Sequence, residues 1–390
     1  MNRFLTTVFF VSFFCCNTLF SWAQQSISID VKADVKPISP LIYGANNSTT
    51  NATAIRWGGN RTTAYNWENN FSNAGEDYNN ISDRFFLNGV STQEQSIPAI
   101  PIVNMVRTAN TRKQYTLVTL QAAGFVAADA NGAVTLEQKA PSSRWDSVVF
   151  RKGSTYSLNP DKTDGKVYID EMVNYLNQSL GAIGSGGIDA FGIDNEPALW
   201  GSTHPLIRPN KLTMNELFYK TREVASVVKE LSPKADVYGP MFYSWSDMYM
   251  LNMDNYVAWN AIKSARGYWG FVDYYLDSLK NVEQEYGKRL LDVLSIHWYP
   301  EAKGTSTNLR IVDLIGTSTQ AQLTAPDMIT ARLQAPRSLW DETYIENSYL
   351  TSQHGALRLI KRLQNSINQY YPGTKLAFTE FNMMPNIIFP

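Results

Sequence analysis

Cysteine is almost absent from the sequence. Only Cys15 and Cys16 are present among 390 residues, and both lie inside an apolar N-terminal run. A chain processed after that run has no disulfide, no thiolate metal site and no cysteine nucleophile. Histidine is also scarce, because the sequence has 3, at positions 204, 297 and 354, without metal-ligand spacing. These absences exclude a disulfide scaffold and argue against a zinc–thiolate site.

Excess charge and nucleotide-binding motifs are missing too. The sequence has 34 Lys and Arg against 35 Asp and Glu, a net charge of −1, which argues against a nucleic-acid partner or an anionic membrane. It contains no G-x-S-x-G elbow, no Walker loop, and no G-x-G-x-x-G after a strand. Hydrophobic residues make up 44% and charged residues 18%, which is typical of a globular, well-cored protein.

The N-terminus has the pattern of a secretory signal peptide. Arg3 precedes an apolar run over residues 4–20, and Ser21 and Ala23 are small residues at −3 and −1 of a cleavage point. We therefore expect a signal peptide over 1–23, cleavage near Ala23, and a secreted mature chain. A membrane anchor is the alternative, which the short run disfavours. No second apolar run could span a bilayer, so no membrane partner is expected for the mature form.

Short apolar runs alternate with amphipathic helical patterns along most of the chain. The helical patterns cover 168–180, 213–231 and 357–367, and the second opens with a capping box formed by Thr213 and Glu216. Such alternation indicates a parallel sheet and predicts a (β/α)8 TIM-type barrel over 41–390. A doubly wound sheet is the alternative. Gly132, Gly153 and Gly165 indicate a long loop between the third and fourth strands. The expected strands are 41–46, 54–60, 115–121, 190–196, 237–242, 293–299 and 376–380.

Two glutamates close the fourth and the seventh of these strands. In "FGIDNEPALW" (191–200) the apolar run ends at Asp194, Asn195 and Glu196, and Pro197 then stops the strand because it has no N–H. Glu380 follows the seventh run. Both side chains would face one mouth of the barrel, as the acid pair of a glycosidase does. The alternative for Glu196 is an ordinary helix-start acid. The separation of the carboxyls, which distinguishes retaining from inverting enzymes, stays open at this point.

Five long blocks of the sequence carry a resemblance to a known family. They are "RWGGNRTTAYNWENNFSNAG" (56–75), "YTLVTLQAAGFVAAD" (115–129), "GIDNEPALW" (192–200), "SIHWYPEA" (295–302) and "RSLWDETYIENS" (337–348). With these blocks the sequence resembles glycoside hydrolase family 44, which contains secreted β-1,4-endoglucanases and xyloglucanases. This resemblance implies a barrel joined to a β-sandwich and a retaining mechanism, with Glu196 as acid/base and Glu380 as nucleophile.

The sequence before the expected barrel and the sequence at its end both differ from what a complete enzyme of this family would have. Ile27, Ile29 and Val31 alternate with polar residues as in a half-buried strand. On the resemblance, 24–40 is the N-terminal strand of an accessory β-sandwich whose remainder is missing. After "LAFTEF", which ends at Phe381, the chain reads "NMMPNIIFP" and departs from the family pattern. We expect a truncated or frame-shifted product, a barrel incomplete after strand seven, open strand edges and poor solubility.

Polar neighbours of the two glutamates are candidate substrate ligands. Asn195 could hydrogen-bond the sugar 2-OH, or it could cap the strand end. His297 could orient or tune Glu380, or it could be structural. Asn60 and Arg61 could donate to substrate or to the nucleophile, whereas the preceding glycines could serve only a tight turn. Candidate stacking platforms, for about half of which core packing is the alternative, are Trp57, Trp67, Tyr243, Trp245, Trp298, Tyr299 and Trp340.

The expected partner is a β-glucan polysaccharide, and no cofactor is expected to be required. Structural calcium is the one ion left open, with Glu68, Glu76 and Asp77 as ligands, although such acids usually belong to a solvated turn. Xylan or mannan is the alternative substrate. A glycan-binding remnant, catalytically dead because of truncation, is the alternative from another functional class, and an unfolded product is the third.

Overall fold

The computed structural model describes residues 28–33, 35, 37–47, 51–251, 256–312 and 319–383. The chain divides into two compact units, Met1–Ser39 and Pro40–Pro390. In the first unit, the described residues form turns and irregular backbone without an assigned strand. The expected signal peptide lies outside the described residues, and the sandwich strand over 24–40 stays a prediction.

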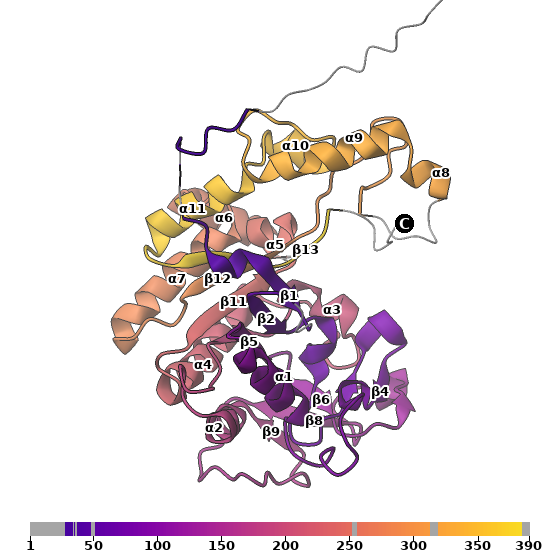
Figure 1. Ribbon diagram of the computed structural model, residues 1–390, viewed down its shortest axis with the longest axis vertical. Coiled ribbons are helices and arrows are strands. Elements are labelled where there is room, and N and C mark those ends of the chain that lie inside the picture. Colours follow the sequence, from indigo (N-terminus) through magenta and orange to yellow (C-terminus); the bar gives the residue numbers. More distant parts are fainter. Residues whose placement is uncertain are drawn as a thin grey trace, which may run out of the picture. The chain divides into compact units, whose positions relative to one another are not determined.

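The second unit is a nearly closed barrel of parallel strands, which confirms the predicted TIM-type fold (Figure 1). Each strand pairs in parallel with its neighbours, and β1 and β13 end the sheet. Six of the seven predicted strands match closely. In order, the strands are β1 (Gly44–Asn46), β2 (Ala54–Trp57), β5 (Tyr115–Leu120), β10 (Ala190–Ile193), β11 (Asp236–Phe242), β12 (Val293–Trp298) and β13 (Lys375–Phe381).

Helices cover the outside of this sheet. The longest ones contact one another in the order α1, α2, α4, α7 and α11, as the successive helices of a barrel do. Thr213 caps α4 by accepting a hydrogen bond from the Glu216 N–H, which is one half of the predicted capping box. The Glu216 carboxylate pairs with Arg208. The helices are α1 (Ile100–Thr111), α2 (Ile169–Leu180), α3 (Trp200–Thr203), α4 (Met214–Leu231), α5 (Trp245–Met250), α6 (Tyr256–Arg266), α7 (Phe271–Tyr286), α8 (Gln320–Leu323), α9 (Pro326–Gln334), α10 (Tyr349–His354) and α11 (Leu359–Tyr370).

Two local predictions are wrong. The expected strand 41–46 begins as a 3-10 helix, η1 (Pro40–Tyr43), because proline favours the first turn of a helix. The expected long loop between the third and fourth strands instead contributes strands to two three-stranded sheets, whose short pairings leave no long periodic signal. These sheets contain β3 (Ser72–Asn73), β4 (Ile81–Asp83) and β7 (Gly132–Ala133), and β6 (Phe125–Ala127), β8 (Trp145–Val149) and β9 (Lys166–Tyr168).

Side chains fill the inside of the barrel, so the place left for chemistry is its mouth. Leu117, Ala190, Tyr238, Met241 and Val293, from four neighbouring strands, form one buried apolar cluster. No described helix is long and apolar enough to cross a membrane.

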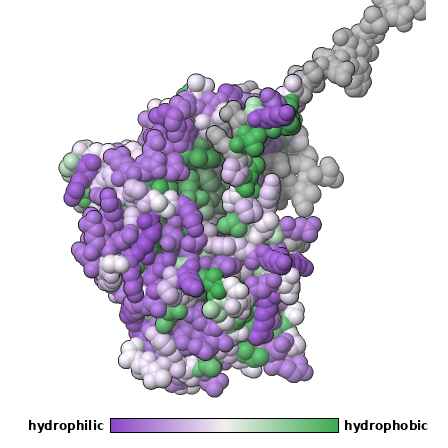
Figure 2. Space-filling view, turned by 60° about the vertical axis from the view of Figure 1, so that its left-hand side comes forward, coloured by the Kyte–Doolittle hydropathy of each residue, from purple (hydrophilic) through white to green (hydrophobic). Residues whose placement is uncertain are grey.

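The sheet is less well covered at its last strand. In β13 the two end residues are exposed and the five between them are half-buried. Hydrophilic side chains predominate on the face in Figure 2, and hydrophobic ones gather in its upper half. The expected open edge and the expected poor solubility both stay predictions.

Candidate active site

A strained turn after β10 carries Glu196. Asp194 and Glu196 both adopt left-handed backbone, with φ of 52° and 42°, which is uncommon for residues other than glycine. Pro197 then begins the 3-10 helix η6 (Pro197–Leu199). Strain of this kind persists where surrounding contacts hold it and clusters at functional sites.

Asp194 provides those contacts. Its Oδ2 accepts hydrogen bonds from the Ala122 and Ala123 N–H groups, at 2.6 and 2.9 Å. Its Oδ1 accepts from the Thr63 hydroxyl at 2.6 Å and from the Asn195 N–H at 2.8 Å. Burial raises the pKa of Asp194 to about 6, although these hydrogen bonds favour the charged form. One buried carboxylate thus ties the turn of Glu196 to the ends of two neighbouring elements.

An irregularity in strand pairing brings Glu380 to the same place. Ile296 pairs with Phe378, but the next residue, His297, pairs with Glu380, so Thr379 is an extra residue in β13. Such bulges re-aim side chains and are frequent beside active sites. The result is that His297 and Glu380 lie directly opposite each other on neighbouring strands.

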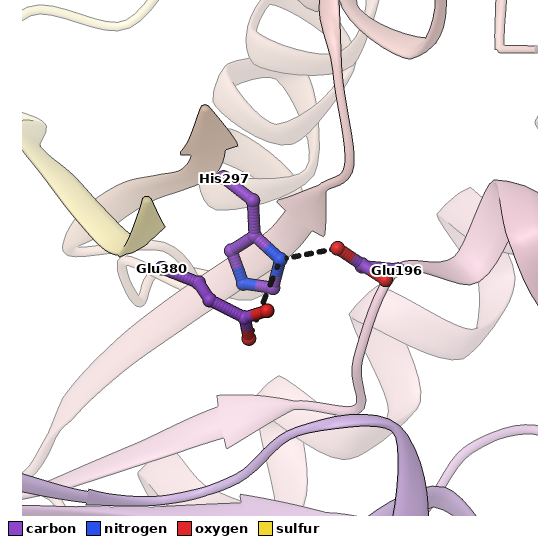
Figure 3. A group of neighbouring side chains, drawn as sticks. All are labelled: Glu196, His297 and Glu380. Carbon is purple, nitrogen blue, oxygen red and sulfur yellow. Dashed lines mark hydrogen bonds and ion pairs between the residues drawn. The ribbon is translucent and has the colours of Figure 1, made fainter. Parts of the chain in front are cut away.

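The two glutamates and His297 form one compact group (Figure 3). His297 Nδ1 lies 2.7 Å from Glu196 Oε1 and 3.8 Å from Glu380 Oε2. One oxygen of each carboxyl and this nitrogen all lie within 4.8 Å of one another. The His297 side chain is fully buried, whereas those of Glu196 and Glu380 are 12% and 25% exposed. The carboxyls therefore face each other at a mouth that solvent reaches.

Glu380 is held in its ionised form. Arg56 Nη1 donates to its Oε2 at 3.0 Å, and the Tyr299 hydroxyl donates to its Oε1 at 2.5 Å. Burial alone would raise the pKa of Glu380, but the charges of His297 and Arg56, together with these hydrogen bonds, hold it below its usual value. An ionised carboxylate at this position is a ready nucleophile.

Arg56 is the residue that sequence reasoning missed. It is buried within β2 and also donates from Nη2 to Asn195 Oδ1 at 2.7 Å, which joins Asn195 to Glu380. A charged residue inside the apolar run "AIRW" was the available signal, because an arginine is almost never fully buried without a partner.

Asp247 is a second missed residue. It is buried and accepts a hydrogen bond from the Tyr243 N–H at 2.9 Å. Burial raises its pKa to about 7, and the nearby charge of Glu196 adds to this shift. Asp247 thus fixes the backbone after β11, close to Glu196.

The predicted aromatic residues separate into two sets. Tyr243 and Tyr299 stack at the mouth, with ring centroids 6.4 Å apart, and Trp340 is 62% exposed. The other four belong to the hydrophobic core, where burial favours packing over sugar stacking. They are Trp57, Trp67, Trp245 and Trp298, each at most 6% exposed.

Asn60 and Arg61 are engaged away from the glutamates. The Asn60 side chain donates to Asp77, and Arg61 donates to Ser72 and Asp83. They begin the 3-10 helix η2 (Asn60–Ala64), which directs them toward the small sheet of β3 and β4. The hydrogen bond to Glu380 that was expected from this pair comes from Arg56 instead.

The three acids expected to hold calcium have separate environments. Glu68 is 2% exposed, and burial together with neighbouring carboxylates raises its pKa to about 8. Glu76 accepts from Asn80, and Asp77 accepts from Asn60. In the described residues, these three acids do not come together as a group of metal ligands. The side chains that lie close enough together to hold a metal ion there are Glu196, His297 and Glu380.

The chain is similar to known glycoside hydrolases. The model of glycoside hydrolase family 44 matches residues 71–302. An endoglucanase A from Paenibacillus lautus is 42% identical over 365 residues, which cover 92% of this chain and 50% of that protein. The chain thus spans half the length of this relative.

Solved structures agree with this likeness. A family 44 endoglucanase from Clostridium thermocellum is 46% identical, with a TM-score of 0.82 over 90% of this chain and 67% of that one. A Paenibacillus polymyxa xyloglucanase of the same family, solved with xyloglucan, is 40% identical, with the same TM-score and coverage. The chain therefore belongs to glycoside hydrolase family 44.

Proposed function

We propose that the chain is a retaining, endo-acting hydrolase of β-1,4-glucan backbones, such as cellulose-type glucan or xyloglucan. The observation that carries this proposal is the short distance between Glu196 and Glu380, whose facing oxygens lie within 4.8 Å. Retaining glycosidases place their carboxyls about 5–5.5 Å apart, whereas inverting enzymes leave about 6.5–9.5 Å for a water molecule. The endoglucanase and xyloglucanase names of the relatives support the choice of glucan.

In the first step, Glu196 donates its proton to the glycosidic oxygen while a Glu380 oxygen attacks the anomeric carbon. The bond to the leaving sugar breaks, and a glycosyl ester forms on Glu380. In the second step, Glu196 takes a proton from water, the water oxygen bonds to the anomeric carbon, and the Glu380 carboxylate is released. The 2.7 Å contact between His297 and Glu196 provides a partner for the proton that Glu196 exchanges.

The neighbouring residues position these groups and the sugar. Arg56 and Tyr299 keep Glu380 charged and aimed. Because Arg56 engages the amide oxygen of Asn195, the amide nitrogen is oriented to donate to the 2-OH. Tyr243 and Trp340 supply apolar faces for glucosyl rings. We also propose that the mature chain is secreted after cleavage near Ala23.

The experiment is reducing-end release by residues 24–390 on xyloglucan, carboxymethylcellulose, xylan and mannan. We expect activity on the two glucans that is lost in Glu196→Gln and Glu380→Gln. Faster hydrolysis of xylan or mannan would replace the proposed substrate. A folded chain that binds glucan without hydrolysing it would identify a glycan-binding remnant instead.

A further inference from the structure

A glycosidase needs only the two carboxyls, yet this site also places an imidazole nitrogen between them. His297 Nδ1 lies 2.7 Å from Glu196 Oε1 and 3.8 Å from Glu380 Oε2, and it is the ring nitrogen that faces both (Figure 3). Imidazole nitrogen and carboxylate oxygen are both ligands that Zn²⁺ takes, and three protein ligands with solvent on the open side leave the fourth position to water. We propose that Glu196, His297 and Glu380 bind a divalent transition-metal ion of the Zn²⁺ class, which blocks the active site.

The distances allow this coordination with small movements. Zinc bonds to carboxylate oxygen and imidazole nitrogen are about 2.0–2.2 Å long, so tetrahedral ligands lie roughly 3.4 Å apart. The three ligand atoms here lie within 4.8 Å of one another. The coordination would need rotations about the side-chain bonds of the two partly exposed glutamates, which lengthen the 2.7 Å separation and shorten the 3.8 Å one toward the separation of tetrahedral ligands.

The charge balance favours a dication. Two carboxylates face the proposed ion, and Arg56 is the cation that opposes it, at 3.0 Å from Glu380 Oε2. With both glutamates ionised and His297 neutral, as a metal-binding histidine must be, the charges of Glu196, Glu380 and Arg56 sum to −1. Each carboxylate oxygen has two acceptor positions, so Arg56 and a metal ion can share Oε2.

The ligand set also predicts which ions bind. Imidazole suits zinc, copper and nickel, whereas calcium takes six to eight oxygen ligands and magnesium requires octahedral oxygen coordination. Since the same oxygens would protonate and attack the substrate, a bound ion would compete with glucan. The binding is independent of the proposed function, whereas the inhibition rests on it.

The test measures Zn²⁺ binding directly, by isothermal titration of the tag-free chain with zinc sulfate. We expect one ion per chain, and binding weakened about tenfold or more in Glu196→Gln and in Glu380→Gln, since losing even an outer partner of a metal ligand costs about 10–100-fold. His354→Gln is the matched control, because it removes an imidazole of a separate aromatic cluster and should leave the site intact. Melting curves verify that each variant folds.

A second measurement needs no variant of the site. Paramagnetic Cu²⁺, added below one equivalent, should broaden the His297 ring signal before those of His204 and His354, the other two histidines of the sequence. The proposal is overturned if the wild-type chain takes up no zinc, if both glutamine variants bind it as tightly, or if another histidine broadens first. Zinc binding and the broadening of the His297 signal are both measured without glucan hydrolysis. A chain that does not hydrolyse glucan could therefore still bind zinc, so failure of the proposed function can be distinguished from failure of this proposal.

Discussion

The guanidinium of Arg56 lies 3.0 Å from a carboxylate oxygen of Glu380, although 324 residues separate them in the sequence. This contact favours the ionised form of Glu380. It helps to hold the pKa of Glu380 below its usual value, while burial acts in the opposite direction.

Replacing Arg56 by Met should therefore move the acidic limb of the pH profile. Without the guanidinium, burial raises the pKa of Glu380, so the nucleophile is protonated over a wider acidic range. The acidic limb of kcat/KM should shift to higher pH, as measured by reducing-end release across pH. Arg61→Met is the control, because Arg61 pairs with Asp83 away from the glutamates. An unshifted limb in Arg56→Met, or an equal shift in both variants, would contradict the assignment.

The lowered pKa also has a consequence for stability. A carboxyl whose pKa is lower in the folded state stabilises folding above its unfolded pKa, and this contribution is lost as pH falls through the folded value. Glu380→Gln should therefore lose less stability between neutral and acidic pH than the wild-type chain does. Thermal melting at several pH values measures this, and parallel curves for the two proteins would count against an ionised, stabilised Glu380.

Tyr299→Phe should reduce kcat while leaving the fold intact. Its hydroxyl donates to Glu380 Oε1, and hydrogen bonds to charged groups contribute about 1.5–3 kcal/mol, equivalent to roughly ten- to hundredfold in rate. Tyr243→Phe is the matched control, since Tyr243 stacks on Tyr299 and no hydrogen bond joins its hydroxyl to either glutamate in the described residues. Both changes keep the aromatic ring, so an equal loss of kcat in the two variants would contradict a special role for the Tyr299 hydroxyl.

Asp194→Asn should lower the free energy of unfolding by about 1–3 kcal/mol, because an amide cannot accept from all four donors that Asp194 now satisfies. Activity should fall as well, since the turn of Glu196 is loosened. Denaturant unfolding measures the first effect. Asp77→Asn, an exposed acid that accepts from Asn60, should change stability by no more than about 0.5 kcal/mol. Wild-type stability in Asp194→Asn would refute this role.

Alanine substitutions of Trp340 and Trp67 should have different effects, the first on KM and the second on stability. Trp340→Ala should raise KM for glucan with little effect on melting, because the ring is 62% exposed. Trp67→Ala should destabilise the chain by about 3–5 kcal/mol, because that ring is fully buried. The paired measurements are KM and melting temperature. An unchanged KM in Trp340→Ala would remove it from the list of sugar platforms.

Local patterns were sufficient to predict the barrel and the two glutamates. Each strand ends within a few residues of a turn signal in the sequence; β10, for example, ends at Ile193, shortly before Pro197. The strands could therefore be counted without tertiary information. The pairing of Arg56 with Glu380, the extra residue Thr379 in β13 and the burial of Trp67 could not be predicted. They depend on which distant segments lie side by side, and a tryptophan at a strand end has the same local pattern whether it faces sugar or core.

The central claim is that Glu196 is the acid/base and Glu380 the nucleophile, and rescue by azide tests it most directly. Glu196→Ala and Glu380→Ala are each given an aryl β-cellobioside with a good leaving group, and the anomer of the cellobiosyl azide is determined by NMR. In Glu196→Ala, azide should attack the ester on Glu380 and give the β-azide. In Glu380→Ala, azide should displace the aryl group directly and give the α-azide. The reverse pattern would exchange the two roles, and the α-azide from both variants would contradict the retaining pair.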